Sequence, residues 1–509
     1  MPQCRIRTSE AINPSLWVAT TPESVARSPA EVAGQFDVIV IGGGITGLTT
    51  ARLLVAEGAS VAVIEAGRIG CGVTGYTTAK VTALQRTTLR EVTERHGAER
   101  AAMYAAANAA AVDLVARFVS DDEIACDFER ASACTYAGTE DDEEAVQAEH
   151  EACTAAGLAT RLDSRVELPF PVRAAVWLDE QAQFHPLQYV LGLAKAFCAD
   201  GGVVFEHVRA LDVEESATGC SVRTSAATLR ADQVVVATLL PFMAAGGFFA
   251  RAHPYRSYAL AVRARGRRLA GMYISAGTPT RSIRSTPDDW VIIGGEGHKV
   301  GQDDDTRLRY AALEAWAREH FEARDVGYRW SAQDYESVDG MPYVGRLTFD
   351  RARTWVATGF RKWGMTNGTA AASMLTDLIA GRTNPWAEAF DSTRLAPGAS
   401  VKKLVTENLE VGKRFVADRI RTWRPRPADE LARGEGDVVT LDGDAVAAFR
   451  DENGTLHAVA ATCTHLGCRL TFNTAERSWD CPCHGSRFDV DGHVLQGPAV
   501  TDLASRDAQ

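Results

Sequence analysis

The order of apolar and polar positions near the start of the chain predicts a strand–helix–strand unit. Residues 37–41 (DVIVI) form a short β-branched apolar run, which is typical of a strand buried on both faces. A glycine-rich segment follows directly, residues 48–57 have helical character, and residues 60–65 predict a second strand. Together these segments make a βαβ unit of about 30 residues.

Further apolar runs continue the α/β pattern. Residues 233–238 and 289–294 predict two more buried strands, and the alanine-rich residues 99–120 predict a close-packed helix. Residues 233–250 carry no charge, but they contain a proline and a Gly-Gly pair, which break a helix. We therefore expect a strand and a loop there, and no membrane span.

The pattern changes after Arg394. Residues 400–423 place apolar side chains near helical spacing and basic side chains elsewhere, which predicts a linker helix that the prolines of residues 424–427 end. Beyond residue 430, short strands separated by Asp-Gly and Asn-Gly turn signals predict a small all-β domain.

Composition and charge exclude several classes of protein. A chain of 509 residues with 46% apolar residues is able to bury more than one core, which excludes global disorder. The 54 Lys and Arg against 66 Asp and Glu give a net charge of -12, so nucleic acid is not an expected partner. Residues 1–30 lack the apolar core of a signal peptide, which predicts a cytoplasmic protein.

The glycine-rich segment carries the first chemical signal. Gly42, Gly44 and Gly47 stand between a strand and a helix, where they allow a tight turn, close approach of a pyrophosphate and close helix–strand packing. Glu65 ends the second strand, where its carboxylate is placed to accept hydrogen bonds from an adenosine ribose. The motif alone leaves NAD and FAD open, and a turn without a ligand is the lesser alternative.

Other stretches favour FAD. With residues 37–65, the stretches at residues 70–80, 234–238, 294–298, 339–345 and 357–366 resemble the D-amino-acid oxidase and glycine oxidase superfamily of flavoproteins. The resemblance implies an α/β fold: a Rossmann-like FAD domain with an interleaved antiparallel-sheet substrate domain, spanning residues 36–395 behind an N-terminal extension of residues 1–35. The FAD part would take about residues 36–95, 176–249 and 336–395, and the substrate part about residues 96–175 and 250–335.

The same resemblance implies which residues hold the FAD. On the ADP half they are Gly42, Gly44, Thr46, Gly47, Glu65 and Ala66, with Val208 as an adenine contact. Thr78 and Lys80 would lie beside the isoalloxazine. At a helix start facing the flavin N1/O2 edge would be Gly359, Trp363, Gly364, Met365 and Thr366. Helix N–H groups there would stabilise an anionic reduced ring, with an ordinary loop-to-helix packing turn as the alternative.

The substrate is less well specified. Enzymes of this superfamily take a hydride from a carbon that bears an amine, and they often hold a carboxylate with Arg or Tyr. Candidate catalytic residues, by position in or near the resembling stretches, are Lys80, Arg256, Tyr343 and Lys362. Each of them fits a structural role equally well.

A second constellation lies near the C-terminus. Cys463, His465 and Cys468 are followed by Cys481, Cys483 and His484. Structural zinc sites usually pair CxxC with HxxxH, whereas CxH followed by CxxH puts one Cys and one His on each of two facing loops. That arrangement suits a 2Fe-2S cluster with two thiolates on one iron and two imidazoles on the other, and zinc is the lesser alternative.

These two boxes, CTHLGC and CPCHGS, resemble the Rieske proteins, over about residues 431–509 behind a linker at residues 396–430. The resemblance implies Cys463 and Cys481 as ligands of one iron, and His465 and His484 as ligands of the other. It implies a disulfide between Cys468 and Cys483, with reduced thiols as the alternative in a cytosolic protein.

Together the two halves predict an enzyme. The leading hypothesis is oxidation of an amine or amino-acid-like small molecule at the flavin, with electrons leaving through the Rieske cluster to an external one-electron acceptor protein. The alternative is that a reductase charges the cluster, which then reduces the flavin for a monooxygenase-like or reductive step. A third reading makes the chain a non-enzymatic electron carrier or redox sensor. The oligomeric state is left open.

Overall fold

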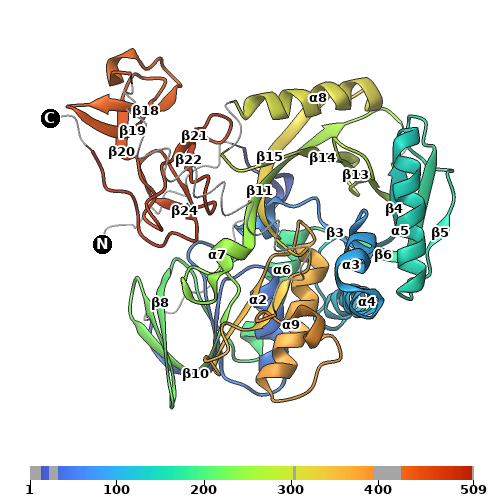
Figure 1. Ribbon diagram of the computed structural model, residues 1–509, viewed down its shortest axis with the longest axis horizontal. Helices are drawn as coiled ribbons and strands as arrows, with labels where there is room; N and C mark the ends of the chain where they lie inside the picture. The colour runs from blue at the N-terminus through green and yellow to red at the C-terminus, as the bar shows by residue number, and fades with distance from the viewer. Residues whose placement is uncertain (1–12, 22–31, 267, 302–304, 395–425, 507–509) are drawn as a thin grey trace.

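The computed structural model describes residues 13–21, 32–266, 268–301, 305–394 and 426–506. The predicted linker helix at residues 400–423 lies outside these ranges. Two large sheets with covering helices make up the first four-fifths of the described chain, and two small sheets form the C-terminal domain (Figure 1).

The first sheet contains the predicted βαβ unit. In order across the sheet, its main strands are β16 (Tyr343–Arg346), β17 (Thr354–Thr358), β10 (Thr228–Val236), β1 (Gln35–Ile41), β2 (Val61–Ile64) and β7 (Val203–Phe205). The pairs from β17 to β7 are parallel, as expected for apolar runs buried on both faces, and β16 is antiparallel. Strands β8 (Ala210–Ser216) and β9 (Gly219–Thr224) extend it as a hairpin. The helices that pack together beside it are α2 (Ile45–Ala56), α6 (Pro186–Ala199) and α9 (Gly364–Ile379).

The second sheet is almost wholly antiparallel. In order, its strands are β15 (Asp325–Ser337), β11 (Ala252–Arg263), β14 (Trp290–Lys299), β13 (Arg281–Ser285), β12 (Met272–Ser275), β4 (Glu129–Ala137), β6 (Ala174–Gln183) and β3 (Lys80–Val81), with β5 (Arg161–Leu162) beside β6. Its helices are α3 (Thr88–His96), α4 (Ala98–Asp121), α5 (Glu143–Ala155) and α8 (Arg307–Phe321). The sheet thus takes strand β3 and most of β6 from segments that the sequence assigned to the FAD part.

The N-terminal extension is partly built into the protein. Helix α1 (Leu16–Thr20) buries Trp17, whose indole N–H donates to the carbonyl oxygen of Thr77 at 2.7 Å. Short elements elsewhere are α7 (Phe248–Arg251), α10 (Ala387–Phe390) and the 3-10 turns η1 (Val73–Tyr76), η2 (Glu140–Asp142), η3 (Ala245–Gly247) and η4 (Ala428–Glu430).

One described helix, α4, is long and apolar enough to cross a membrane by length and composition, and half of its most apolar stretch is buried inside the protein. Core helices of the same composition share this property, so it shows no membrane span. The uncharged residues 233–250 form the end of β10, a loop and the short elements η3 and α7, as the sequence predicts.

The C-terminal domain is all-β, as predicted. Three antiparallel strands, β18 (Gly436–Leu441), β19 (Asp444–Arg450) and β20 (Leu456–Ala460), form one sheet, and β21 (Thr471–Asn473), β22 (Ser478–Asp480), β23 (Arg487–Phe488) and β24 (Val494–Gln496) form the other. Positive φ angles at Asp442 and Gly443 make the predicted two-residue hairpin turn. In Figure 1 this domain, coloured orange to red, lies beside β11, β15 and α7.

Candidate flavin and iron–sulfur sites

The glycines of the nucleotide loop are required by backbone contacts. Gly42 has φ +112°, and a Cβ atom on it would lie 2.5 Å from the carbonyl oxygen of Ala237. A Cβ atom on Gly47 would lie 1.9 Å from the carbonyl oxygen of Gly42. Helix α2 begins two residues after Gly43, so the turn delivers a helix N-terminus directly at the end of β1.

Glu65 holds this loop in place. Its two carboxylate oxygens accept the amide hydrogens of Gly43 at 2.8 Å and Gly67 at 2.7 Å. Burial raises the pKa of the Glu65 carboxyl in spite of these amide bonds. The side chain is therefore fixed at the carboxyl end of β2, where the sequence expected it to meet a ribose.

The other ADP-side candidates lie around the same loop. Thr46 is buried in the first turn of α2, and Ala66 is half-buried directly after Glu65. Val208 is buried, and its amide donates to the carbonyl oxygen of Glu65 at 2.9 Å.

The predicted flavin-edge residues lie where β17 turns into α9. Gly359 has φ +80°, Trp363 is the N-cap residue, and α9 begins at Gly364. Met365 and Thr366 are buried in the first turn. The first amides of a helix have no acceptor within the helix, which suits the oxygen-rich edge of a flavin.

A buried polar network that sequence reasoning missed supports this helix start. Gln85 Nε2 donates to Thr366 Oγ1 at 2.9 Å and to Asn108 Oδ1 at 2.9 Å. The Tyr104 hydroxyl donates to Gln85 Oε1 at 2.5 Å and accepts from Asn367 Nδ2 at 3.1 Å. Gln85 lies before α3, and Tyr104 and Asn108 lie one turn apart on α4, without a motif that marks them.

Lys80 and Lys362, two of the predicted catalytic residues, differ in burial. Lys80 is buried on β3, and its ammonium group donates to the carbonyl oxygen of Tyr273. Burial and the nearby guanidinium of Arg284 hold the Lys80 pKa well below its usual value. Lys362 is exposed: its Nζ lies 3.9 Å from the Glu336 carboxylate, and its amide donates to a carboxylate oxygen of Asp334.

The other two are packed among arginines and acids. The Tyr343 ring is held between the guanidinium groups of Arg251 and Arg394, each 4.1 Å from its centre. Arg256 is 1% exposed, and its guanidinium donates to Asp480 of the C-terminal domain at 2.9 Å. Arg256 therefore lies at the interface between domains, where a buried carboxylate already pairs with it.

The two Cys/His boxes adopt matching turns. In each box a glycine four residues after the first cysteine donates its amide to that cysteine's carbonyl: Gly467 to Cys463 at 2.9 Å and Gly485 to Cys481 at 3.0 Å. Both glycines have φ near +75°, at +73° and +75°. The matching turns place one Cys and one His on each of two facing loops, as the spacing predicts.

The four predicted ligands converge. The exposed fraction is 3% for Cys463, 1% for Cys481 and 5% for His484, and His465 is half-buried. The His465 and His484 rings are 5.1 Å apart between centres. Their Nδ1 atoms are buried, and neither has a hydrogen-bond partner within the described part of the chain. Two orphaned imidazole nitrogens beside two thiols fit a metal cluster, because buried polar atoms otherwise find partners.

Protonation in the apoprotein also suits ligation. A hydrogen bond from Cys481 lowers the pKa of the Cys463 thiol to about 7, and the same bond raises the pKa of Cys481. Burial, with the nearby His465, lowers the pKa of His484 to about 3. Metal ligands must be a thiolate and a neutral imidazole, so one thiol and the imidazole are already close to the ligating form.

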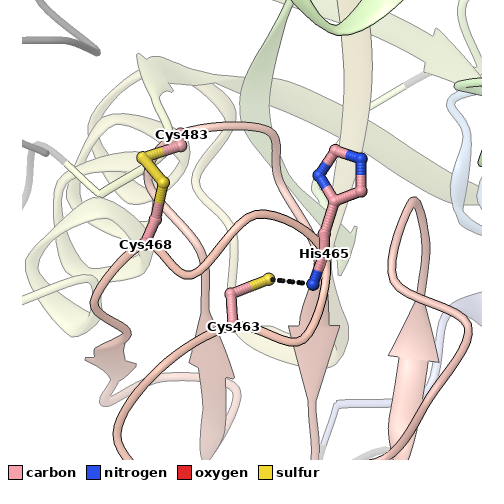
Figure 2. The surroundings of a disulfide bond; sticks show 4 residues. All are labelled: Cys463, His465, Cys468 and Cys483. Atoms are coloured by element: carbon pink, nitrogen blue, oxygen red, sulfur yellow. Dashed lines mark hydrogen bonds between the residues drawn. A yellow bond between two sulfur atoms is a disulfide. The ribbon is translucent and has the colours of Figure 1, made fainter. Parts of the chain in front are cut away.

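The predicted disulfide is present. Cys468 and Cys483 are joined, with their Cα atoms 6.5 Å apart, and the bond ties the two boxes together; Figure 2 shows it near Cys463 and His465. Figure 2 also shows the amide of His465 donating to Cys463 Sγ, at 3.4 Å. The Cys481 thiol lies within 4.8 Å of both disulfide sulfurs.

The C-terminal domain rests on one face of β11 and β15. Gln333 and Tyr335 alternate along β15, and Arg256 lies opposite Gln333 on β11. Gln333 Nε2 donates to the carbonyl oxygen of Gly485 at 2.7 Å, and the Tyr335 hydroxyl donates to that of His484 at 2.8 Å. The second box is therefore bound directly by the second sheet.

Phe249 of α7 completes this contact. Its ring meets the His484 ring edge-on at 5.3 Å and the His465 ring at 6.2 Å between centres. Sequence reasoning missed this face, because residues 331–337 mix polar and apolar positions without a regular period.

Comparison with known proteins agrees with both halves. The family model described as FAD dependent oxidoreductase matches residues 37–378, and that described as Rieske [2Fe-2S] domain matches residues 424–506. The chain is 35% identical to the Rieske 2Fe-2S iron-sulfur protein YhfW of Bacillus subtilis (strain 168), over 93% of this chain and 94% of that protein. It is 41% identical to the cytochrome b6-f complex iron-sulfur subunit 1 of Cyanophora paradoxa, over 17% of this chain and 36% of that one.

A solved structure shares the fold of the larger part. Glycine oxidase from Geobacillus kaustophilus superposes with a TM-score of 0.60 at 17% identity, covering 71% of this chain and 99% of the oxidase. Proteins with the first family's domain bind FAD, and a Rieske domain binds a 2Fe-2S cluster. The chain belongs to the FAD dependent oxidoreductase family and carries a C-terminal Rieske domain.

Proposed function

We propose that this flavoenzyme oxidises a C–N bond in an amine or amino-acid-like small molecule, and that the electrons leave through the Rieske cluster to an external one-electron acceptor protein. One observation carries the proposal: the cluster boxes lie against the oxidoreductase part of the same chain, where Phe249 contacts both histidine rings and the Tyr335 hydroxyl donates to the His484 carbonyl oxygen. A cluster held in this position is suited to exchange electrons with a flavin in the same chain.

Backbone groups and a few side chains would hold the FAD. We assign the ADP half to the loop and strand ends around it, at Gly42, Gly44, Thr46, Gly47, Glu65, Ala66 and Val208. We assign the isoalloxazine to Thr78, Lys80 and the start of α9, at Gly359, Trp363, Gly364, Met365 and Thr366. Bound FAD would supply a two-electron acceptor for a hydride. The network through Gln85 and Tyr104 fixes the first turn of α9 in the orientation that this contact needs.

The cluster would be held by Cys463 and Cys481 on one iron and by His465 and His484 on the other. A 2Fe-2S cluster carries one electron at a time. The disulfide, the matching turns and the face of β11 and β15 hold these four side chains in fixed positions.

For the substrate, we propose Lys362 as the available cation. Its side chain is 40% exposed and has a carboxylate 3.9 Å away, so an incoming substrate carboxylate could replace that weak partner. Lys80 is engaged with Tyr273, Tyr343 is packed between two guanidinium groups, and Arg256 pairs with Asp480. These three are better suited to positioning the site than to binding substrate. The cytoplasmic location stays a prediction.

An anaerobic titration tests the proposed function. The holoprotein is mixed with a panel of amines and amino acids without oxygen, while the visible flavin absorbance and the EPR signal of the reduced cluster are recorded. An active amine should bleach the flavin and then produce the cluster signal. If every amine fails while dithionite or a reduced ferredoxin charges the cluster first and the flavin second, electrons flow in the opposite direction and the proposal is wrong.

A further inference from the structure

Tyr335 contacts both the second cluster box and the loop that leads into α9. It is fully buried near the end of β15, at 0% exposed area. Its hydroxyl donates to the backbone carbonyl oxygen of His484 at 2.8 Å, so the side chain reaches the cluster box. On its other side, the carbonyl oxygen of Tyr335 accepts the amide hydrogen of Arg361 at 3.1 Å.

Arg361 belongs to the loop that leads into α9. That loop is bonded to β15 at three consecutive positions: the Asp334 carboxylate accepts the amide of Lys362, Tyr335 accepts Arg361, and Glu336 pairs with Phe360. Arg361 and Lys362 both have positive φ, at +51° and +71°, a conformation that non-glycine residues keep only when their surroundings impose it. The bonds from β15 are those surroundings.

Tyr335 is thus linked by one hydrogen bond to a cluster-ligand residue and by another to the loop at the proposed flavin edge. We propose that Tyr335 is the positioning residue that couples the two redox sites, fixing His484 and the residue 360–363 loop relative to each other. This inference rests on the proposed function, in which two electrons leave the substrate together and reach a one-electron acceptor in two successive transfers through the cluster.

Gln333 provides a matched control. It lies on the same face of the same strand, and it also donates to a backbone carbonyl of the second box, that of Gly485, at 2.7 Å. Its backbone makes ladder contacts with β11, whereas the loop before α9 is bonded by residues 334–336. Gln333 Oε1 also accepts from Arg256 at 3.1 Å, and the Gln333 side chain contacts the Tyr335 hydroxyl, so Gln333→Met weakens the docking of the domain more broadly. It leaves in place the bonds of Tyr335 to His484 and Arg361.

The test uses Tyr335→Phe, with Gln333→Met as the control, in the full chain loaded with FAD and cluster. A flash of light with an external photoreductant injects one electron, and its exchange between flavin and cluster is followed by absorbance. A buried hydrogen bond contributes about 1.4 kcal/mol, which corresponds to about tenfold in an equilibrium. We expect Tyr335→Phe to slow the exchange by about that factor by reducing the population of the coupled geometry. Gln333→Met should slow it much less.

Two further readouts separate positioning from simple destabilisation. The EPR spectrum and the reduction potential of the cluster should stay those of the unmodified protein in Tyr335→Phe, because no ligand changes. Proteolysis between the two domains should accelerate at least as much in Gln333→Met as in Tyr335→Phe. Equal exchange rates in Tyr335→Phe and the unmodified protein, or equal slowing in both variants, would overturn the inference. Should Tyr335→Phe fail to fold, Tyr335→Leu is judged by the same criteria.

The readout does not depend on substrate. If no amine reduces the protein but the flash experiment still shows the Tyr335 dependence, the direction or substrate class of the proposed function is wrong and the coupling role stands. If amines reduce flavin and cluster in turn while Tyr335→Phe exchanges at the normal rate, the function stands and the coupling role is wrong.

Discussion

The nucleotide loop and the cluster boxes present different groups to what they bind. At residues 42–47 the chain offers backbone: glycines that leave no room for a Cβ atom, and amides at the start of α2. At residues 463–468 and 481–486 it offers side chains, two thiols and two imidazoles whose Nδ1 atoms find no partner in the described chain. A backbone site is damaged by adding atoms, and a side-chain site by removing them.

The largest effect that follows is loss of the cluster on removing one ligand. Cys481→Ser replaces a buried thiolate with a hydroxyl, a poor ligand for iron in such a cluster. We expect iron and sulfide content near zero and no EPR signal after reduction, with FAD still bound. Cys71→Ser, at an exposed thiol outside both boxes, is the control and should keep the full cluster. A fully loaded cluster in Cys481→Ser would remove that residue from the ligand set.

Adding one methyl group tests the other half of the comparison. In Gly47→Ala the new Cβ atom would lie 1.9 Å from the carbonyl oxygen of Gly42, so α2 and the loop must move apart. Overpacking of this kind costs about 3 kcal/mol. We expect purified protein with little FAD but with an intact cluster, measured by flavin absorbance and iron content. Gly138→Ala adds the same methyl group in open space, and normal FAD content is expected there. Equal FAD content in both variants would contradict the predicted role of the loop.

At the domain interface, the buried ion pair of Arg256 and Asp480 predicts a loss of folding stability comparable with that of Gly47→Ala. Removing one partner of a buried pair costs about 3–5 kcal/mol, and we expect Arg256→Met to fall near the lower limit because Asp480 keeps Arg487 at 3.2 Å. Denaturant unfolding measures this loss in the free energy of unfolding. Arg382→Met breaks an exposed pair with Glu57 and should cost less than about 1 kcal/mol. A similar cost for both variants, together with weaker amine binding in Arg256→Met, would return Arg256 to the substrate site.

The sequence was informative where chemistry is local. Each half of the predicted site lies within a short stretch: Gly42 to Glu65 for the nucleotide, and Cys463 to His484 for the cluster. The turn at Asp442-Gly443 is equally local. The fold class followed from the short apolar runs of the sequence and from its resemblance to the D-amino-acid oxidase superfamily.

What the sequence did not supply was the arrangement between the two halves. Arg256 was a catalytic candidate by its position near the resembling stretches, with a structural role equally possible, but it pairs with Asp480, 224 residues away. Tyr335 and Phe249 carry no motif, and their contacts depend on how the C-terminal domain docks. The second sheet also takes more strands than predicted, since β3 and most of β6 pair within it. Such contacts are decided by packing of distant segments, for which no spacing rule exists.

The smallest effect concerns a second buried carboxylate, which contrasts with Asp480. Two arginines hold the pKa of Asp480 below its usual value in spite of burial. Glu149 is fully buried, and its donors among the described residues are the amides of Leu89 and Arg90 and the thiol of Cys153. Burial raises the pKa of Glu149 to about 7.

The sign of the pH dependence follows from that rise. Because the folded protein holds the Glu149 proton more tightly than the unfolded chain, this residue favours folding below its ordinary pKa of 4.5, and the benefit is lost as pH rises towards 7. The change is at most about 3 kcal/mol between those values. Glu149→Gln keeps the volume and removes the titration, so its free energy of unfolding should fall less over this pH range than that of the unmodified protein. Denaturant unfolding at a series of pH values measures the difference, and parallel curves for the two proteins would show that Glu149 is ionised in the folded state at neutral pH.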